Sequence, residues 1–585
     1  MLCLPRRTLQ PVLPLLLVAV ALAACDEPDN SETDDTTPDS ETVPTDDSDP
    51  IVDTETDPVD TETDTETDTE SDPPSPTSTL PWTGVGPLYC LAPSLRAEAR
   101  FDHQVARMPD IDAPYVAGGG VGAFDIDGDD VFELFATRED EVMMFRRQAD
   151  GTYDSITILE QDASGDRGWF GISGADYDGD LDIDLYVSNY GGPNVMLRND
   201  GGRLIDVTDT TGTAGPPEHF SASTSWADFD RDGDLDLLIS GHGHVVEDGT
   251  LQVSQFEPAD PTLLFANNGD GTFSDHSHVL PAAAAGAYTF NATFVDVDAD
   301  FWPEIYYAND FAGQREPSQC AHNNQGVFSL ESADPSLTVR IVGMGLGVGD
   351  ANGDAIPDIL LPGWRSLGFL MSAGGAWFEQ SQITGVAADA SRGQGMAWGA
   401  ELGDVDNDGD VDALVNFGYL NTIFATNDYY QPDAVYIQEN NLQFEDRALE
   451  WDLNQRGSSR GLVLADLNRD GFLDVMKATL DNEVRVAESR CGDRPWLRVQ
   501  LRQPGLNRHA VGARLEAFLP DGRRMTRWVF AGGTGYGSGA MPEVHFGLDS
   551  VLTLPELHIY WPDGGHDVLY DLPARHAIRV ERDPT

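Results

Sequence analysis

The sequence predicts an all-β protein in which seven short antiparallel sheets form a ring, followed by a small C-terminal β domain. Three observations lead to this prediction. An acidic motif recurs seven times between residues 125 and 474. Its copies begin 51 to 68 residues apart, which leaves room for about four short strands and their turns. The 59 glycines and 36 prolines indicate many turns and few long helices.

Each copy of the motif has the pattern D-x-D/N-x-D-x-x-x-D/E and leads into a run of β-forming residues. We number the copies loops 1 to 7; they begin at Asp125, Asp176, Asp228, Asp296, Asp350, Asp404 and Asp466. Three copies share a downstream phrase that starts at Asn194, Leu263 or Cys320. That phrase is typical of a strand, an Asn/Gly turn and a second strand.

The unit length and the copy number favour a seven-bladed β-propeller over residues 81–492. A small sheet has two faces that it cannot bury alone, and packing around a closed ring buries both of them. A linear β-solenoid is the alternative architecture. The number of units and their length favour the ring.

The acidic loops predict a metal site in each repeat. Carboxylates at positions 1, 3 and 5 of a tight loop converge, and a carbonyl at position 7 and a carboxylate at position 9 complete an oxygen cage. Hard oxygen ligands suit Ca²⁺ better than zinc or copper. The loops are shorter than EF-hand loops and no helix follows them. Solvated acidic turns are the alternative, but seven repetitions favour up to seven structural Ca²⁺ ions.

The predicted ligands stand at positions 1, 3, 5 and 9 of each loop. They are Asp125, Asp127, Asp129 and Glu133; Asp176, Asp178, Asp180 and Asp184; Asp228, Asp230, Asp232 and Asp236; Asp296, Asp298, Asp300 and Glu304; Asp350, Asn352, Asp354 and Asp358; Asp404, Asp406, Asp408 and Asp412; Asp466, Asn468, Asp470 and Asp474. No other cofactor is predicted.

Position 6 distinguishes the loops, because a positive φ is often needed there and glycine adopts it most easily. Loops 3 and 6 carry Gly233 and Gly409 at this position. Loop 5 carries Ala355 at position 6 and the uncharged Asn352 at position 3. We therefore expect loops 3 and 6 to form the best sites and loop 5 the weakest.

The net charge excludes one class of partner and supports the metal prediction. The formal net charge of the chain is −67, of which −48 falls on residues 81–585. Nucleic-acid binding requires a basic surface, so a nucleic-acid partner is excluded. Clustered carboxylates destabilise the compact state unless cations neutralise them. The same charge favours a monomer.

The N-terminus is typical of an exported lipoprotein. Arg6 and Arg7 precede an apolar run that ends in Leu-Ala-Ala-Cys25, so 1–25 resembles a bacterial lipoprotein signal with lipidation of Cys25. An ordinary secretory signal is the alternative. Residues 26–80 carry 21 acidic and no basic residues, which predicts an unstructured linker. We expect a lipid-anchored protein on the periplasmic face of the bacterial envelope or the cell surface, with no other membrane association.

Three further cysteines follow. Cys90 lies just before loop 1 and Cys491 just after loop 7, so a disulfide between them could clasp the ends of the ring. Cys320 would then be a free, buried thiol.

The repeats resemble FG-GAP/VCBS repeats, and 493–585 resembles the ASPIC/UnbV domain. The C-terminal phrases that carry this resemblance are WLRVQL from Trp496, NRHAVGARLEAF from Asn507, GGTGYGSG from Gly532, HFGL from His545 and WPDG from Trp561. Together they are similar to the cartilage acidic protein family. This resemblance implies a calcium-binding propeller followed by a small β-sandwich-like domain, with no established enzymatic activity.

Inside the C-terminal domain, 496–501 and 513–519 alternate as strands, and Asp521-Gly522 indicates a hairpin. We expect the glycine phrase from Gly532 to be a turn that holds this domain together; a ligand-binding face is the alternative. No catalytic motif stands out, and the pairs His242/His244 and His276/His278 are more typical of loops than of metal ligands.

Two functional classes follow. The first is a binding or adhesion module that presents a calcium-stabilised ring to an extracellular or envelope protein or glycan. The second is an exported enzyme that uses the funnel at the centre of the ring. A purely structural envelope component is a further alternative.

Overall fold

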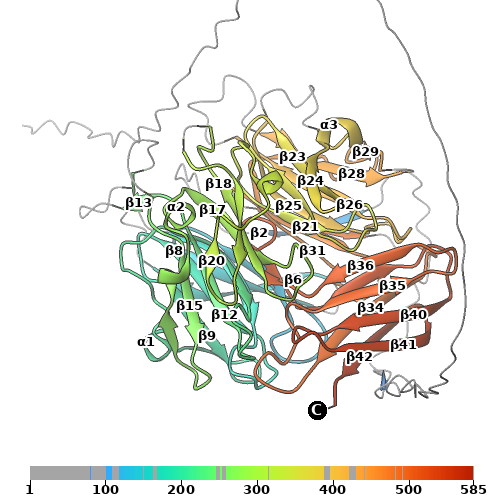
Figure 1. The fold of residues 1–585 in the computed structure, drawn as a ribbon, viewed down its shortest axis with the longest axis horizontal. Helices are drawn as coiled ribbons and strands as arrows, with labels where there is room; N and C mark the ends of the chain where they lie inside the picture. Colours follow the sequence, from blue (N-terminus) through green and yellow to red (C-terminus); the bar gives the residue numbers. More distant parts are fainter. Residues whose placement is uncertain are drawn as a thin grey trace, which may run out of the picture. The chain divides into compact units, whose positions relative to one another are not determined.

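The computed structural model describes residues 79–80, 101–107, 118–148, 151–161, 168–245, 251–252, 259–313, 315–387, 395–419, 430–439, 442–480, 483–489 and 492–583. The predicted signal, nearly all of the linker, and Cys25, Cys90 and Cys491 lie outside these residues. The chain divides into two units, and the second, Pro76–Thr585, holds every described residue (Figure 1). Among the described residues, no helix is long and apolar enough to cross a membrane.

Seven antiparallel sheets, each with four strands of its own, follow one another along the chain. We number them sheets 1 to 7. In hydrogen-bonding order their strands are β3 (Val121–Phe124), β4 (Glu133–Thr137), β5 (Glu141–Arg147) and β6 (Tyr153–Glu160); β7 (Gly168–Ala175), β8 (Asp184–Tyr190), β9 (Val195–Asn199) and β10 (Leu204–Asp206); β11 (Ser221–Ala227), β12 (Asp236–Gly241), β15 (Leu263–Asn267) and β16 (Phe273–Asp275); β17 (Thr289–Val295), β18 (Glu304–Asn309), β19 (Gln319–Asn323) and β20 (Phe328–Ser329); β21 (Gly347–Gly349), β22 (Asp358–Pro362), β23 (Leu367–Ala373) and β24 (Ala376–Glu379); β25 (Ala397–Gly403), β26 (Asp412–Phe417), β28 (Ala434–Gln438) and β29 (Phe444–Asp446); β31 (Ser459–Ala465), β32 (Asp474–Thr479), β33 (Glu483–Ser489) and β2 (Phe101–Arg107).

The first strands of neighbouring sheets pack against one another. β3 contacts β7, β7 contacts β11, β11 contacts β17, β21 contacts β25, and β25 contacts β31. Sheets 4 and 5 share a hydrophobic cluster that contains Val295 and Val348. β31 also contacts β3, so the last sheet returns to the first. The outer strand of sheet 7 is β2, which precedes sheet 1 in the chain and pairs with all of β33. The fold is therefore propeller-like.

Burial follows the position of a strand within its sheet. Every residue of β7 and β8 is buried, whereas most of β6 is exposed or half-buried. Strands that are covered on both faces read as continuous apolar runs rather than as an alternating pattern. The described residues also include short elements in the connections within and between the sheets, which are β13 (His244–Val245), β14 (Leu251–Gln252), β27 (Gln431–Pro432), β30 (Arg456–Gly457), α1 (Thr208–Thr211), α2 (Ala282–Ala285), α3 (Ser381–Thr384), η1 (Ser277–Val279) and η2 (Pro335–Leu337).

The C-terminal domain consists of two four-stranded sheets that share one hydrophobic cluster. One sheet contains β1 (Thr79–Leu80), β42 (His576–Glu581), β34 (Trp496–Arg502) and β39 (Val544–Gly547). The other contains β36 (Arg524–Trp528), β35 (Arg514–Phe518), β40 (Thr553–Tyr560) and β41 (His566–Pro573). The strands expected at 496–501 and 513–519 are confirmed. Thr79 and Leu80 differ from the expected linker, because they pair with Val580 and Arg579.

The glycine phrase from Gly532 does not stay within the C-terminal domain. Its flanks, β37 (Ala531–Gly532) and β38 (Gly539–Ala540), pair with β11 and β3. Between them, the N–H of Gly535 donates to the carbonyls of Leu346, at 2.8 Å, and Ala400, at 3.2 Å. We call 531–540 the central segment, because it contacts the first strands of several sheets at once. The expectation that this phrase only holds its own domain together is wrong.

Tyr536 anchors the central segment. Its side chain is fully buried and packs against Phe170, Phe290 and Trp398, with ring centroids 5.1, 5.7 and 5.2 Å away. Glycine is needed beside it, because a Cβ on Gly533 would lie 2.2 Å from Oγ1 of Thr293. The Tyr536 ring and these three aromatic rings therefore occupy space between the first strands.

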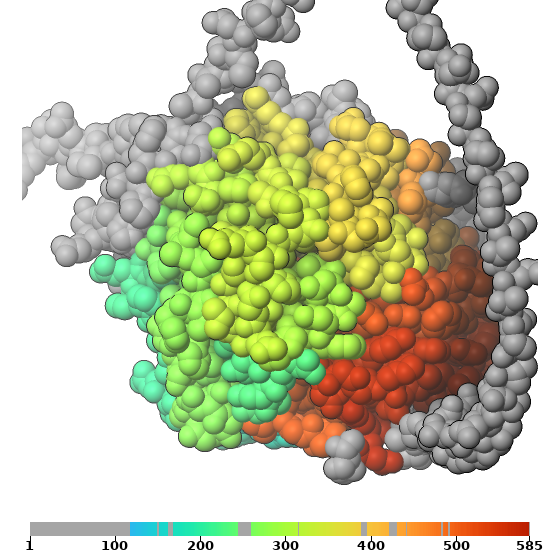
Figure 2. Space-filling model, in the orientation of Figure 1, coloured from blue at the N-terminus to red at the C-terminus, as the bar shows by residue number. Residues whose placement is uncertain are grey.

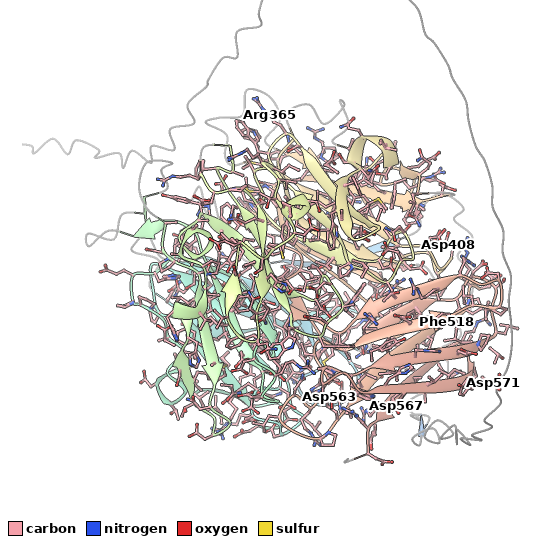
Figure 3. All side chains as sticks on the ribbon, in the orientation of Figure 1. Arg365, Asp408, Phe518, Asp563, Asp567 and Asp571 are labelled. Carbon is pink, nitrogen blue, oxygen red and sulfur yellow. The ribbon has the colours of Figure 1, made fainter. Side chains whose placement is uncertain are left out.

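The C-terminal domain also covers the acidic loops, where the first strand of each sheet ends. The N–H groups of Asn507 and Asp549 donate to the carbonyls of Gly233 and Asn407, and Arg523 donates to the carbonyl of Asp408. Figure 2 shows the C-terminal residues, in red, packed against the repeats, and Figure 3 labels Asp408 beside the C-terminal sheet. The C-terminal domain carries 11 acidic residues and 11 arginines, whose charges cancel. The formal net charge of −48 on residues 81–585 therefore lies on the repeats that precede this domain.

Candidate metal sites in the acidic loops

Each acidic loop joins the first and second strands of one sheet, and its position-9 carboxylate begins the second strand. These residues are Glu133, Asp184, Asp236, Glu304, Asp358, Asp412 and Asp474, and all are buried. In loop 2, Asp184 accepts hydrogen bonds from the N–H of Tyr177, at 3.2 Å, and from that of Asn199, at 2.8 Å. The position-9 carboxylate thus ties its loop to the third strand of the sheet.

The position-1 carboxylate accepts several backbone hydrogen bonds. In loop 2, Oδ1 of Asp176 accepts from the N–H groups of Gly179 and Asp180, and Oδ2 accepts from that of Leu181, at 2.9 to 3.0 Å. Loops 1 and 5 repeat this arrangement. A ring of N–H donors therefore fixes the carboxylate before any cation binds.

Positions 4 and 6 adopt positive φ in all seven loops. The N–H at position 6 donates to the position-1 carboxylate in every loop, and the N–H at position 4 does so in loops 1, 2 and 5. The position-6 angles run from 65° at Asp130 to 100° at Gly233, which confirms the expectation for that position. Leu181 and Phe301 adopt it without being glycines, at 80° and 66°. A left-handed non-glycine residue costs about 1–2 kcal/mol. The surrounding hydrogen bonds hold this strain, as is common at functional sites.

The folded loops bring their carboxylates close together. Groups whose donor atoms lie within 4.8 Å of one another occur in loops 1 to 4; they are Asp125, Asp127 and Glu133; Asp176, Asp178 and Asp184; Asp228, Asp230 and Asp232; and Asp296, Asp298 and Asp300. Several acidic clusters could therefore hold a metal ion. Oxygen donors of this kind suit a hard divalent cation.

Burial raises the pKa of these carboxyl groups. It is the largest cause of a pKa of about 7 for Asp176 and Asp228 and about 6 for Asp296, and neighbouring carboxylates add to it. The pKa of Glu304 rises to about 9 for the same reasons. A nearby cation favours the charged form of a carboxyl group. In loops 2, 3 and 4 a metal ion could therefore supply positive charge that favours the ionised carboxyl groups.

Some loops contact positive charge from the chain itself. Arg146 lies 3.4 Å from Asp127 and 3.0 Å from Glu133 in loop 1. Arg494 lies 2.7 Å from Asp406 in loop 6. Among the described residues, the carboxylates at positions 1, 3, 5 and 9 of loops 2 and 3 form no ion pair with arginine. The loops therefore differ by partners that lie outside the motif.

Loop 5 is held by neutral hydrogen bonds. The side chain of Asn352 donates to the carbonyl of Ser372, at 2.8 Å, and the hydroxyl of Ser372 donates to Asp354, at 2.9 Å. Asp354 thus already has a donor on its carboxylate. The expectation that loop 5 is the weakest site, and loops 3 and 6 the best, stays a prediction.

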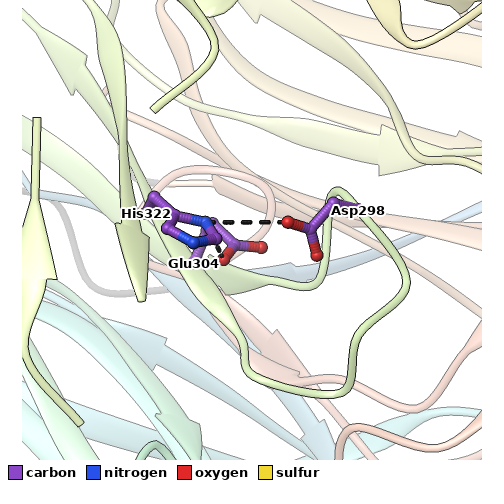
Figure 4. Close-up of side chains that lie close together, drawn as sticks. All are labelled: Asp298, Glu304 and His322. Atoms are coloured by element: carbon purple, nitrogen blue, oxygen red, sulfur yellow. Dashed lines mark ion pairs between the residues drawn. The ribbon is translucent and has the colours of Figure 1, made fainter. Parts of the chain in front are cut away.

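Loop 4 has a nearby nitrogen donor that could join a metal site, His322 on β19. Its Nδ1 lies 3.0 Å from Glu304 and 3.6 Å from Asp298 (Figure 4). Glu133 in sheet 1 and Glu304 in sheet 4 both begin a second strand at position 9 of their loops. Arg146 contacts Glu133 in sheet 1 as His322 contacts Glu304 in sheet 4. Sequence reasoning missed His322 because it lies 18 residues beyond Glu304, on another strand.

Three asparagines on third strands tie each loop to its neighbour. Asn199, Asn267 and Asn323 donate from Nδ2 to the carbonyl at position 2 of the preceding loop, at 2.8 to 2.9 Å. Each also bonds the carbonyl at position 8 of its own loop. The recurrent Asn in the strand-turn-strand phrase was the available signal for this role.

The histidine pairs and the free cysteine that the sequence also singled out are accounted for by packing and by secondary structure. His242 is buried and stacks on Phe290 with ring centroids 3.6 Å apart. His278 lies in η1 rather than on a strand, so His276 and His278 lack the shared strand face that chelation requires. Cys320 is buried and free, as expected.

Two segments match protein-family models. Residues 503–585 match the ASPIC and UnbV model, and residues 176–239 match the FG-GAP-like repeat model. Cartilage acidic protein 1 of Xenopus tropicalis is 22% identical over 491 residues, which cover 70% of this chain and 73% of the relative. The human protein is 22% identical over 475 residues, covering 68% of this chain and 69% of the relative.

A solved structure of an Agrocybe aegerita lectin that recognises non-reducing terminal N-acetylglucosamine is also similar. It is 15% identical, has a TM-score of 0.36, and the match covers 64% of this chain and 88% of the lectin. At that score the similarity does not establish a shared fold. The chain combines an FG-GAP-like repeat with an ASPIC/UnbV domain and is distantly similar to cartilage acidic protein 1.

Proposed function

We propose that this chain is a calcium-stabilised, seven-bladed β-propeller that acts as a binding or adhesion module for an extracellular or envelope protein or glycan. One observation carries the proposal. The first strand of all seven sheets ends in the same strained loop, with positive φ at positions 4 and 6. Strain of this kind clusters at functional sites, where the surrounding structure holds it. Calcium is structural in this proposal.

The ligand chemistry supports Ca²⁺ over softer metals. The candidate donors are carboxylate oxygens in flexible loops, with a backbone carbonyl at position 7, and Ca²⁺ takes six to eight oxygens. The repeats carry nearly all of the −48 on the folded part, so bound cations relieve repulsion between the loops. An ion that binds only the folded state stabilises it by mass action.

The central segment supports a binding role over the alternative of an enzyme that uses the funnel of the ring. A funnel enzyme needs open space on the axis, but the buried Tyr536 ring and the aromatic rings around it occupy space between the first strands. The C-terminal domain covers the acidic-loop face. A partner would therefore use another surface, and a purely structural envelope role stays the second alternative.

Trp364 and Arg365 form a candidate contact on such a surface. Arg365, labelled in Figure 3, is exposed, and its guanidinium lies 4.5 Å from the centroid of the Trp364 ring. Both residues lie between β22 and β23, at the end of the sheet opposite its acidic loop. Tryptophan and arginine are enriched among residues that dominate interface energies.

The test measures bound calcium and thermal unfolding of the full chain, with and without chelator. We expect up to seven Ca²⁺ per chain and a large fall in the unfolding temperature when calcium is removed. Partner binding, measured on glycan arrays and with envelope extracts, should weaken when calcium removal destabilises the fold. A calcium-free chain with unchanged melting would contradict the proposal.

The export proposal rests on the sequence alone. We propose an exported, monomeric lipoprotein anchored through Cys25 in the bacterial envelope. Labelling with a radioactive fatty acid in the expressing cell should mark the wild-type chain and not the Cys25→Ala variant. Equal labelling of both would contradict the anchor.

A further inference from the structure

Two histidines lie side by side on the outer face of the sheet β36-β35-β40-β41. His566 is directly opposite Tyr560, and His558 precedes Tyr560 by two residues, so all three side chains share one face. The Nδ1 atom of His558 and the Nε2 atom of His566 are 3.2 Å apart. Neither histidine is fully buried. Two imidazole nitrogens therefore face each other at a solvent-accessible place.

A carboxylate fixes the tautomer of His558. Oε2 of Glu556 lies 3.2 Å from Nε2 of His558. The carboxylate accepts a hydrogen bond, so Nε2 carries the proton and Nδ1 keeps its lone pair, which is directed at His566. Metal-ligating histidines almost always donate their other N–H to a carboxylate, a carbonyl or water in this way.

The separation of the two nitrogens matches a shared metal ion. Zinc–nitrogen bonds of 2.0–2.1 Å at the tetrahedral angle place two ligand nitrogens about 3.3 Å apart. The observed 3.2 Å is close to that separation, and the two rings need only tilt so that both lone pairs meet at the ion rather than lie along one N···N line. In the metal-free state the same distance serves one N–H···N hydrogen bond, whose proton the metal would displace.

Neighbouring residues hold both rings in place. The Tyr560 ring stacks on His566, with centroids 4.4 Å apart and planes 8° from parallel. Phe518, labelled on β35 in Figure 3, lies 4.7 Å from the His558 ring. The hairpin that joins the strands is fixed by the buried Trp561, whose Nε1 donates to Asp567 at 2.7 Å. Ligands held by packing and hydrogen bonds make precise sites.

We propose that His558 and His566 form a surface site for a divalent transition-metal ion, Cu²⁺ or Zn²⁺. Imidazole nitrogens suit these ions, and affinity for a given site is highest for Cu²⁺. Glu556 positions one ligand, and water or a group from another molecule completes the coordination. The site is independent of the acidic loops, because its ligands are nitrogens on another domain.

Two carboxylates and two arginines share the face of the histidine pair. Glu516 and Glu556 lie there, and Arg514 and Arg524 are 3.1 and 3.8 Å from Glu516. The carboxylate that contacts the pair directly is Glu556, 3.2 Å from His558.

The experiment titrates Cu²⁺ into the full chain in saturating Ca²⁺, by calorimetry and by electron paramagnetic resonance. Calcium occupies oxygen sites and leaves the histidine pair free. We expect one Cu²⁺ equivalent with a spectrum of two equatorial nitrogens. His558→Asn and His566→Asn should abolish that equivalent, and Glu556→Gln should weaken it about tenfold or more.

His576→Asn is the matched control, because His576 is an exposed histidine of the same domain whose Nδ1 already contacts the carbonyl of Ala574. It should keep the Cu²⁺ equivalent. Unfolding temperatures of the metal-free variants establish that each one folds. A Cu²⁺ equivalent that survives His566→Asn, or a spectrum with oxygen ligands only, would overturn the proposal. Calcium stoichiometry is measured separately, so failure of the acidic loops to bind calcium would be distinguishable.

Discussion

Arg498 of the C-terminal domain forms an almost fully buried ion pair with Asp466 of loop 7, with Nη1 and Oδ2 3.2 Å apart. Its Nη2 lies equally close to Asp130 of loop 1. One guanidinium therefore joins the first and last acidic loops, at the place where the last sheet meets the first. A charge from the C-terminal domain thus partly neutralises the carboxylates of these two loops.

Replacing this arginine should destabilise the chain strongly. Arg498→Met leaves the buried carboxylate of Asp466 without its ion-pair partner, whereas half-buried Asp130 keeps Arg469 at 3.3 Å. Breaking a buried pair in this way costs about 3–5 kcal/mol. The free energy of unfolding, measured by denaturant in saturating calcium, checks this. Arg447→Met removes ion pairs with the exposed Glu445 and Glu450 and should cost at most about 1 kcal/mol. Equal effects of the two variants would contradict the structural role of Arg498.

The bridging asparagines predict a contrast between adjacent residues. Asn267→Ala removes the donor to the carbonyls of Tyr177 and Leu235 and leaves both buried, which costs about 1–3 kcal/mol. Asn268→Ala removes exposed side-chain hydrogen bonds with Thr272 and Ser274 and should change stability by about 0.5 kcal/mol or less. Urea unfolding of the two variants measures the difference. If Asn268→Ala lost more unfolding free energy than Asn267→Ala, the hydrogen bonds of Asn267 would not be what ties the sheets together.

The central segment predicts a second contrast. A Cβ on Gly345 would lie 2.3 Å from the carbonyl oxygen of Trp398 and 2.4 Å from that of Gly535, and backbone cannot move aside cheaply. Gly345→Ala should therefore cost about 1–3 kcal/mol or more and expose the C-terminal domain to protease. Gly313→Ala meets nothing within 4 Å and serves as the control. Unchanged proteolysis of the Gly345 variant would contradict tight packing of the segment.

Loop 1 should bind calcium more tightly without its own arginine. Arg146 places a guanidinium beside Asp127 and Glu133, where it repels an incoming cation. Arg146→Gln should raise the calcium bound per chain at limiting free calcium, as measured by equilibrium dialysis. Arg447→Gln, which pairs with no acidic loop, should leave it unchanged. Reduced binding by the Arg146 variant would mean that the arginine organises the loop rather than competing with calcium.

Glu401 predicts a pH dependence that is separate from the loops. It lines a cavity of about 160 Å³ between β25 and the C-terminal domain, and Thr534 donates to it at 3.0 Å. Burial raises its pKa to about 8, against an ordinary 4.5. Between pH 4.5 and about 8 the folded state therefore holds a proton on Glu401 that the unfolded state has released. The stabilisation that comes from this proton is complete below pH 4.5 and is lost as pH rises to about 8.

Glu401→Gln should remove that contribution. In saturating calcium, the stability of the wild type relative to the variant should fall by up to about 1.4 kcal/mol per pH unit across this window and level off above it. Denaturant unfolding of both chains at pH values from about 5 to 9 measures this difference in stability. A difference between the two chains that rises with pH would contradict the raised pKa.

Local chemistry explains which features could be predicted. The loop positions, the strands that follow them and the positive φ at position 6 all depend on residues close together in the sequence. Leu181 and Phe301 show the limit of this reasoning, because their left-handed backbone follows from the N–H groups that position 1 requires rather than from their own preference. The glycine phrase looked like a local turn because nothing near it in the sequence reveals the sheets that it meets.

By itself, the sequence determined the repeat, the acidic loops with their ligand spacing and the presence of a separate C-terminal domain. Only the tertiary structure decided which loops receive an arginine, where the central segment lies and which histidines meet on one sheet. The reason is distance along the chain. Arg498 and Asp130 are 368 residues apart, and no spacing rule connects residues that only the folding of the sheets brings together.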